Sequence, residues 1–160
     1  MRKRVLALLT FVPIIVGYIV NLSLSLPVIG TVIYYVLPLL TTAFWFCLGT
    51  QYARTTWKTI PAILIGNSTG IISLLIYFWQ FLLETDVTRN LTLAGASQMF
   101  SASAPGYLLS RIALLFEKQP NTIGMASAVA LQVISVVYMI AVFSAAILLE
   151  KKRIKNTSAK

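Results

Sequence analysis

Residues 2–22 read RKRVLALLTFVPIIVGYIVNL, which is three cations followed by eighteen uncharged and mostly apolar residues. Clusters of Lys and Arg also adjoin apolar runs at residues 54–58 and 151–160. Cytoplasmic ends of transmembrane helices carry an excess of Lys and Arg, and four crossings would bring all three clusters to one face. The cations predicted to anchor this topology and contact lipid head groups are Arg2, Lys3, Arg4, Arg54, Lys58, Lys151, Lys152, Arg153 and Lys155.

Four apolar runs have the length of about 20 residues that crosses a hydrocarbon core of about 30 Å. The hydrophobic fraction is 58%, above the share of about 45–50% found in globular domains. We therefore predict an all-α polytopic membrane protein, folded as a single bundle of four transmembrane helices in the cell membrane with both termini cytoplasmic. The predicted spans are 5–22, 28–50, 60–83 and 123–149, with an outer loop at 84–120 and a basic tail at 150–160.

The charged and catalytic residue types limit the possible functions. The net charge is +9, but its confinement to helix ends argues against a nucleic-acid partner. The chain has no histidine and one cysteine, Cys47, which excludes His-based catalysis and His or multi-thiolate metal sites. We predict no catalytic, metal or cofactor site and no enzyme activity, and interpret the outer-loop acids Glu84, Asp86 and Glu117 as solvated charges.

The N-terminal segment has two possible interpretations. Its cations and apolar run resemble a secretory signal peptide, and Ser23-Leu24-Ser25 is a weak cleavage pattern. The apolar stretch is slightly longer than the core of a signal peptide, so we favour an uncleaved first helix.

The segment 93–116 also allows more than one arrangement. We favour an amphipathic helix at the outer membrane surface or packed back onto the bundle. A re-entrant hairpin is the alternative, in which 94–104 enters the bilayer and Pro105-Gly106 forms the turn. A fifth span is the least favoured, because it would separate the basic clusters onto two faces.

Two prolines lie near the middle of the first two spans. Pro13 and Pro38 each remove a backbone hydrogen bond and tend to kink a helix. The hydroxyls of Thr10, Thr41 and Thr42 are close enough in sequence to bond to backbone groups freed in this way. We interpret the prolines either as packing features or as hinges that border a shallow cavity.

Small and polar residues form stripes on the third and fourth spans, where they allow close helix packing and interhelical hydrogen bonds. Whether these stripes face the same chain or another subunit is left open by the sequence. The predicted packing residues are Gly66, Asn67, Gly70 and Ser73 on the third span, and Gly124, Ala128, Gln132 and Ser135 on the fourth.

These stripes lead to our first functional hypothesis, a non-catalytic accessory or regulatory subunit that acts through helix–helix contacts. Its partner would be another membrane protein or a second copy of the chain, within the lipid bilayer. The alternative is a small-solute transporter or transport subunit, with a pathway near Pro13 and Pro38.

Overall fold

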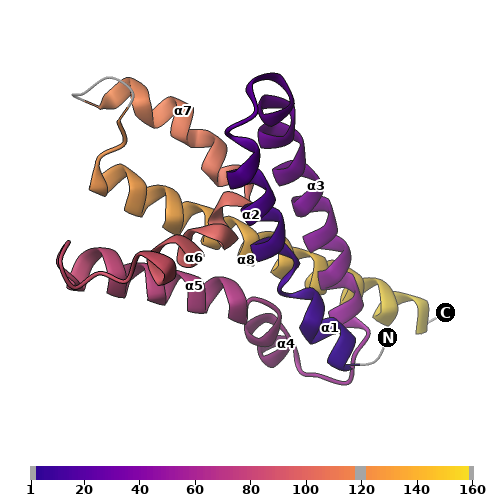
Figure 1. The fold of residues 1–160 in the computed structure, drawn as a ribbon. Coiled ribbons are helices and arrows are strands. Elements are labelled where there is room, and N and C mark those ends of the chain that lie inside the picture. Colours follow the sequence, from indigo (N-terminus) through magenta and orange to yellow (C-terminus); the bar gives the residue numbers. More distant parts are fainter. Residues whose placement is uncertain (1–2, 118–121, 159–160) are drawn as a thin grey trace.

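The computed structural model describes residues 3–117 and 122–158, which form helices and no strands (Figure 1). Three helical segments within these ranges are long and apolar enough to cross a membrane: Lys3–Ser23, Pro27–Ala53 and Met125–Thr157. A fourth candidate is a bent pair of helices, Thr59–Gly66 with Ser68–Leu83. The predicted all-helical class and the apolar runs are thus present, but two of the runs are interrupted.

The first apolar run forms two helices, α1 (Lys3–Leu9) and α2 (Val12–Ser23), where the sequence predicted one. The interruption lies just before Pro13, which occupies the first turn of α2. Proline is well tolerated in a first turn because the N–H that it lacks would have no intrahelical partner there. Pro13 therefore begins a new helix.

The second run is the continuous helix α3 (Pro27–Ala53), which contains Pro38. The Thr41 and Thr42 hydroxyls donate to the carbonyls of Leu37 and Pro38. Neither of these is the Tyr34 carbonyl, which is the helical acceptor four residues before Pro38. The predicted compensation by these two hydroxyls is therefore wrong.

The third run divides into α4 (Thr59–Gly66) and α5 (Ser68–Phe78), bent by 54° at Asn67, and ends in the π-helical turn η1 (Trp79–Leu83). The sequence predicted a single span across 60–83 and gave no indication of the bend. Gly and Asn are weak helix formers, and an Asn side chain competes for backbone hydrogen bonds. Gly66 and Asn67 together explain why the helix bends here.

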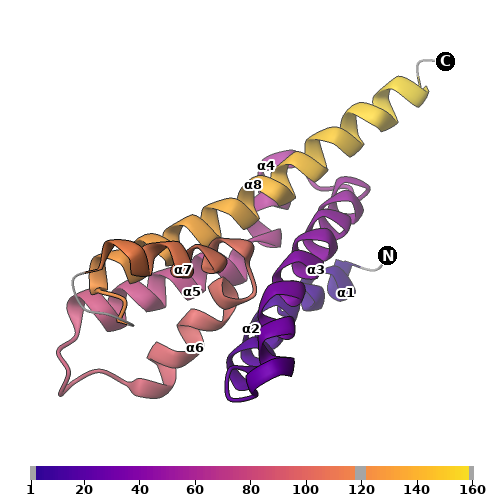
Figure 2. The ribbon, with the colours of Figure 1, turned by 90° about the horizontal axis from the view of Figure 1, so that it is seen from above.

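The segment that follows forms a helical hairpin. Helix α6 (Leu91–Ala102) runs into the molecule, and η2 (Pro105–Leu109), α7 (Ser110–Ala113) and η3 (Leu114–Phe116) run back out (Figure 1). Seen from above, α6 lies between α5 and α2 (Figure 2). Helix α6 therefore packs onto the bundle, which is one of the arrangements that the favoured prediction allowed, and its depth in a bilayer stays a prediction. The returning arm packs back onto α8 and α3.

The long helix α8 (Met125–Ser158) continues through the basic tail and makes its most extensive contact with α3. Their shared core contains the fully buried rings of Trp45, Tyr52 and Phe143. Both chain ends and the α3–α4 connection lie at the same end of the molecule (Figure 1). Side-chain contacts hold this end together, as described below.

Candidate functional site

The break between α1 and α2 leaves a backbone carbonyl without its helical partner. Pro13 has no N–H to give to Leu9, and the Ile14 N–H bonds to the Phe11 carbonyl at 3.0 Å. The Thr10 carbonyl consequently receives no backbone N–H among the described residues, although Thr10 is only 2% exposed. A buried carbonyl in this position needs a donor from elsewhere in the protein.

The bend between α4 and α5 is held by the side chain of Asn67, which is 1% exposed. Its Nδ2 donates to the Ile63 carbonyl at 2.9 Å, and its Oδ1 accepts the indole N–H of Trp45 at 3.3 Å. The Ile63 carbonyl also accepts the backbone N–H of Asn67, so the amide adds a second bond at this helix end and connects the bend to the core of α3. The sequence predicted a helix-packing role for Asn67 and did not predict the bend at this residue.

The two breaks contact each other. The Thr69 hydroxyl, at the start of α5, donates to the Thr10 carbonyl across 2.8 Å in a buried setting. Helices α1 and α4 have seven and eight residues before their breaks. At about 1.5 Å per residue, both interruptions lie about 10–12 Å from the end that carries the basic clusters.

The glycines of the predicted stripe on the third span face aromatic rings of the same chain. A Cβ at Gly66 would collide with the Phe143 ring of α8, and one at Gly70 would lie 2.6 Å from the Phe100 ring of α6. The Phe100 ring in turn packs edge-on against Trp45, with centroids 5.8 Å apart. These small residues therefore leave room for rings that join α5 to α6 and α8.

The α6 hairpin presents hydroxyl-bearing and small residues to the bundle interior. Ser97 and Ser101 are 2% and 1% exposed. A Cβ at Gly17 would collide with the Met99 carbonyl, so glycine permits α2 to approach the α6 backbone. Gly106, at the turn, lies against Ser135, since an added Cβ would be 2.9 Å from the Ser135 Cα.

Three polar atoms in this region are buried without a partner among the described residues. They are the Oγ of Ser101, the Oε1 of Gln132 and the Oγ of Ser135. Gln132 and Ser135 lie one turn apart on α8, where the sequence predicted a packing stripe. An unpaired buried polar group costs about 1–3 kcal/mol in proteins. These side chains therefore make the centre of the bundle polar at a cost in stability.

A small pocket opens directly beside the two breaks, between α2, α5 and α6. It has a volume of about 230 Å³ and includes Phe11 and Ile14 from the first break and Ser68 and Thr69 from the second. Ser97 of the hairpin also lines it. The breaks and the hairpin thus border one space.

The remaining predicted stripe and hinge residues have other positions. Pro13 is buried in the first turn of α2, and Pro38 is buried within α3. Gly124 lies outside α8, exposed, where its N–H donates to Glu117 Oε1 at 3.0 Å. Ala128, one turn into α8, is half-buried. Gly124 is therefore part of a helix start, not of a packing face.

Several of the predicted basic anchors make side-chain contacts at one end of the bundle. Glu150 of α8 is 8% exposed and bonds to Arg54 of α3, with an N–O distance of 2.8 Å. Lys151 donates to the Thr59 hydroxyl at 2.9 Å, and Lys3 lies over the Trp57 ring at 5.5 Å. These contacts place the N-terminal, central and C-terminal clusters at one end of the bundle.

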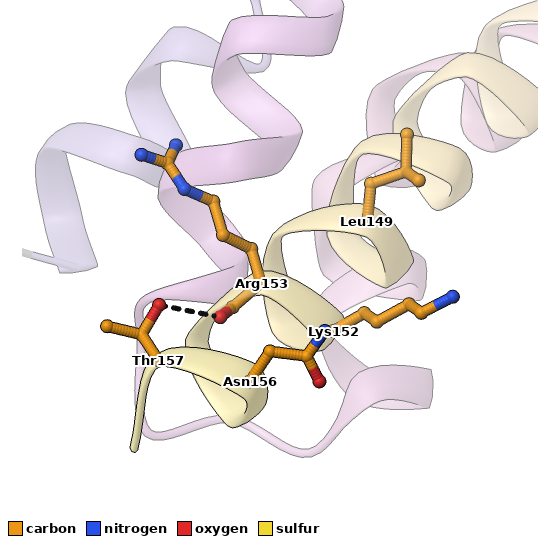
Figure 3. Close-up of a pocket in the computed structure, with 5 residues that line it drawn as sticks. All are labelled: Leu149, Lys152, Arg153, Asn156 and Thr157. Carbon is orange, nitrogen blue, oxygen red and sulfur yellow. Dashed lines mark hydrogen bonds between the residues drawn. The ribbon is translucent and has the colours of Figure 1, made fainter. Parts of the chain in front are cut away.

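The other predicted cations at this end are solvent-facing. Lys58, Lys152 and Lys155 are exposed, and Arg153 reaches Glu150 at 3.8 Å while 76% of its side chain stays exposed. A shallow hollow on the α8 surface is lined by side chains of that helix alone, with Arg153 and Lys152 extending in different directions (Figure 3). Arg2 and residues 159–160 lie outside the described ranges, as do residues 118–120 of the predicted outer loop.

The three outer acids do not converge. Glu84 accepts the indole N–H of Trp79, Asp86 pairs with Arg89 at 2.9 Å, and Glu117 bonds to Gly124. Hydrogen bonds from the Ser127 hydroxyl and the Gly124 N–H lower the pKa of the Glu117 carboxyl. No group of three potential metal ligands occurs within the ranges that the structure describes.

Sequence reasoning missed the pairing of Thr10 with Thr69. The position of Thr10 before a proline and that of Thr69 in a polar patch were visible signals, but nothing in the sequence joins them. No protein-family model, curated protein or solved structure matches this chain.

Proposed function

We propose that this chain carries a small solute across the membrane, with its binding region at the junction of the two broken helices. The observation that carries the proposal is the hydrogen bond from Thr69 to the Thr10 carbonyl, which joins both interruptions. Discontinuous helices in corresponding positions are a recurring feature of solute sites in transporters. Irregular backbone is tolerated at membrane depth where it is buried in protein or lines a cavity.

The proposed arrangement counts the α4–α5 pair as a bent span, which gives four crossings. The α6 hairpin would be re-entrant, and both chain ends would be cytoplasmic in the cell membrane. The contacts of Arg54, Lys151 and Lys3 at one end support this orientation when combined with the positive-inside rule.

The two halves of the chain support the proposal through their similar order of elements. Each begins at the basic end with a helix that breaks after seven or eight residues, and each returns through a long helix, α3 or α8. The sequence halves show no convincing similarity, so the parallel is one of architecture. In the proposed arrangement the two interruptions would lie at a similar depth.

The accessory-subunit hypothesis stays untested, and the stripes that motivated it now give it less support. Gly66 and Gly70 are covered by rings of the same chain, and Gly106 of the hairpin covers Ser135. These faces therefore need no second protein to be buried. We favour solute passage for this reason.

Cysteine accessibility tests the proposal. In a Cys47→Ala background, Phe11→Cys and Ser68→Cys would introduce thiols at the two breaks. The matched controls are Leu8→Cys and Leu64→Cys, whose native side chains are 69% and 55% exposed on the apolar surface. We expect a water-soluble, membrane-impermeant thiol reagent to label the break positions in intact vesicles and to spare the controls. Equal protection of all four positions would contradict a solute pathway.

A permeability measurement tests passage itself. Proteoliposomes would be mixed with a hyperosmotic neutral solute, such as glycerol or urea, and their reswelling followed by stopped-flow light scattering. We expect protein-dependent reswelling for at least one small neutral solute, and a slower rate when Phe11 is replaced by Trp to fill the pocket. Rates identical to those of empty liposomes across a series of solutes would contradict the proposal.

A further inference from the structure

The pocket beside the breaks has a distinct chemical character. Four of its lining residues carry hydroxyls, Ser68, Thr69, Ser73 and Ser97, and the others are aliphatic or aromatic. None of its lining residues is ionisable. A charged solute would enter this apolar setting without a counter-charge, which is strongly unfavourable. The pocket therefore selects for neutral molecules.

Three of the four hydroxyls already donate their proton to a backbone carbonyl. Ser68 donates to Ile65 at 2.9 Å, Thr69 to Thr10 at 2.8 Å, and Ser97 to Ala94 at 2.7 Å. A hydroxyl has one donor and two acceptor lone pairs. These three oxygens consequently offer acceptors, and no further proton, to a molecule in the pocket.

Ser73 is the fourth hydroxyl and differs from the others. It is 6% exposed and makes no hydrogen bond to another described residue, although it lines the pocket. In the packing stripe predicted for the third span, aromatic rings occupy the space beside its neighbours Gly66 and Gly70. Among the hydroxyls that line the pocket, Ser73 thus keeps its proton and its lone pairs available to an occupant.

We propose that this pocket binds a small, neutral molecule that has an apolar body and one N–H or O–H group. That group would donate a hydrogen bond to the Ser73 Oγ. The apolar lining holds the body, and the excess of acceptor oxygens recognises an N–H or O–H group. This inference rests on the proposed function, because it names the class of solute that would pass through the protein. The binding itself can be measured without transport.

Indole and indene form a suitable probe pair, because they have nearly the same shape and only indole carries an N–H donor. Binding would be measured by equilibrium dialysis against the full chain in lipid nanodiscs, with binding to empty nanodiscs subtracted. We expect indole to bind about 3- to 10-fold more tightly than indene, the range of one hydrogen bond. Ser73→Ala should remove most of that preference while leaving indene binding nearly unchanged.

Two neighbouring positions on α6 provide the steric test. Ala96→Leu adds bulk at the wall of the pocket and should weaken both probes at least 5-fold. Gly95→Leu is the matched control, because Gly95 lies outside this pocket and an added Cβ meets no atom within 4 Å. Thermal unfolding of each variant would show that it is folded before binding is compared.

Each outcome is decisive. Equal affinity for indole and indene, a preference that survives Ser73→Ala, or equal effects of the two leucine substitutions would overturn the proposed site. The expected binding pattern without solute permeation would support the site and contradict the transport function. Permeation that is unaffected by Ala96→Leu, together with absent indole binding, would support transport and contradict this pocket as its site.

Discussion

Replacing Thr69 by Val tests the contact between the two breaks with little change in side-chain shape. The substitution removes the hydroxyl that donates to the Thr10 carbonyl at 2.8 Å. That carbonyl belongs to a residue that is 2% exposed and has no backbone donor among the described residues. The variant would therefore leave a buried acceptor without a partner.

The expected loss of stability follows from this unpaired carbonyl. An unsatisfied buried acceptor costs about 1–3 kcal/mol, whereas interhelical hydrogen bonds in membrane proteins average about 0.6 and reach about 1.7 kcal/mol. We expect a loss of about 1–2 kcal/mol, which is a factor of about 5–30 in the unfolding equilibrium. Unfolding in mixed micelles by titration with a denaturing detergent, followed by tryptophan fluorescence, measures this difference.

Thr41→Val is the matched control. Thr41 is 4% exposed and its hydroxyl bond is also 2.8 Å long, but its acceptor is the Leu37 carbonyl within the same continuous helix. That carbonyl keeps its helical N–H partner, so we expect a loss below about 0.5 kcal/mol. Equal losses for the two variants would refute the inference that Thr69 satisfies a break.

Three further predictions concern packing, pH and the basic end. Gly17→Ala should destabilise the protein by about 1–3 kcal/mol, because its Cβ would collide with α6; Gly95→Ala, with open space around its Cβ, should be nearly neutral in the same detergent titration. The hydrogen bonds of the Glu117 carboxyl lower its pKa in the folded protein. The ionised carboxylate should therefore stabilise the fold above the unfolded pKa of about 4.3, and this stabilisation should be lost as the pH falls through the lower folded pKa. Glu117→Gln should abolish this acid-dependent fraying of the start of α8 in hydrogen exchange, and an unchanged pH profile would count against the cap. Glu150→Gln should increase proteolysis at the α3–α4 connection by weakening the pair with Arg54, whereas Glu84→Gln should have no effect there.

The sequence predicted the apolar helices and the common end of the basic clusters because both depend on local composition. Averaged hydropathy measures how apolar a run is, and it does not report whether the helix is continuous. Pro13 and Asn67 were visible as unusual residues, yet a proline can kink a helix or begin one. In the structure Pro13 begins a helix, and the donor to the Thr10 carbonyl at this break is Thr69, which is distant in sequence.

The α6 hairpin shows a second limit of sequence reasoning. Its serines and alanines predicted a poor lipid-facing helix, which agrees with its burial, but they equally suited a surface position. The deciding contacts are Gly17 with the Met99 carbonyl, Gly70 with Phe100, and Gly106 with Ser135. Each joins residues that are distant in sequence, so the composition of 93–116 alone could not reveal them.

The most direct test of the junction is a distance measured in a lipid bilayer. Solid-state NMR with selective ¹³C labels would report the separation of the Thr10 carbonyl carbon and the Thr69 Cβ. The 2.8 Å hydrogen bond, with about 1.2–1.5 Å for each flanking bond, limits this separation to about 5.5 Å. A cross-peak between the two carbons at long mixing times, which corresponds to a separation within that limit, is the predicted result. A separation beyond about 8 Å in the bilayer would show that the two helix breaks do not meet.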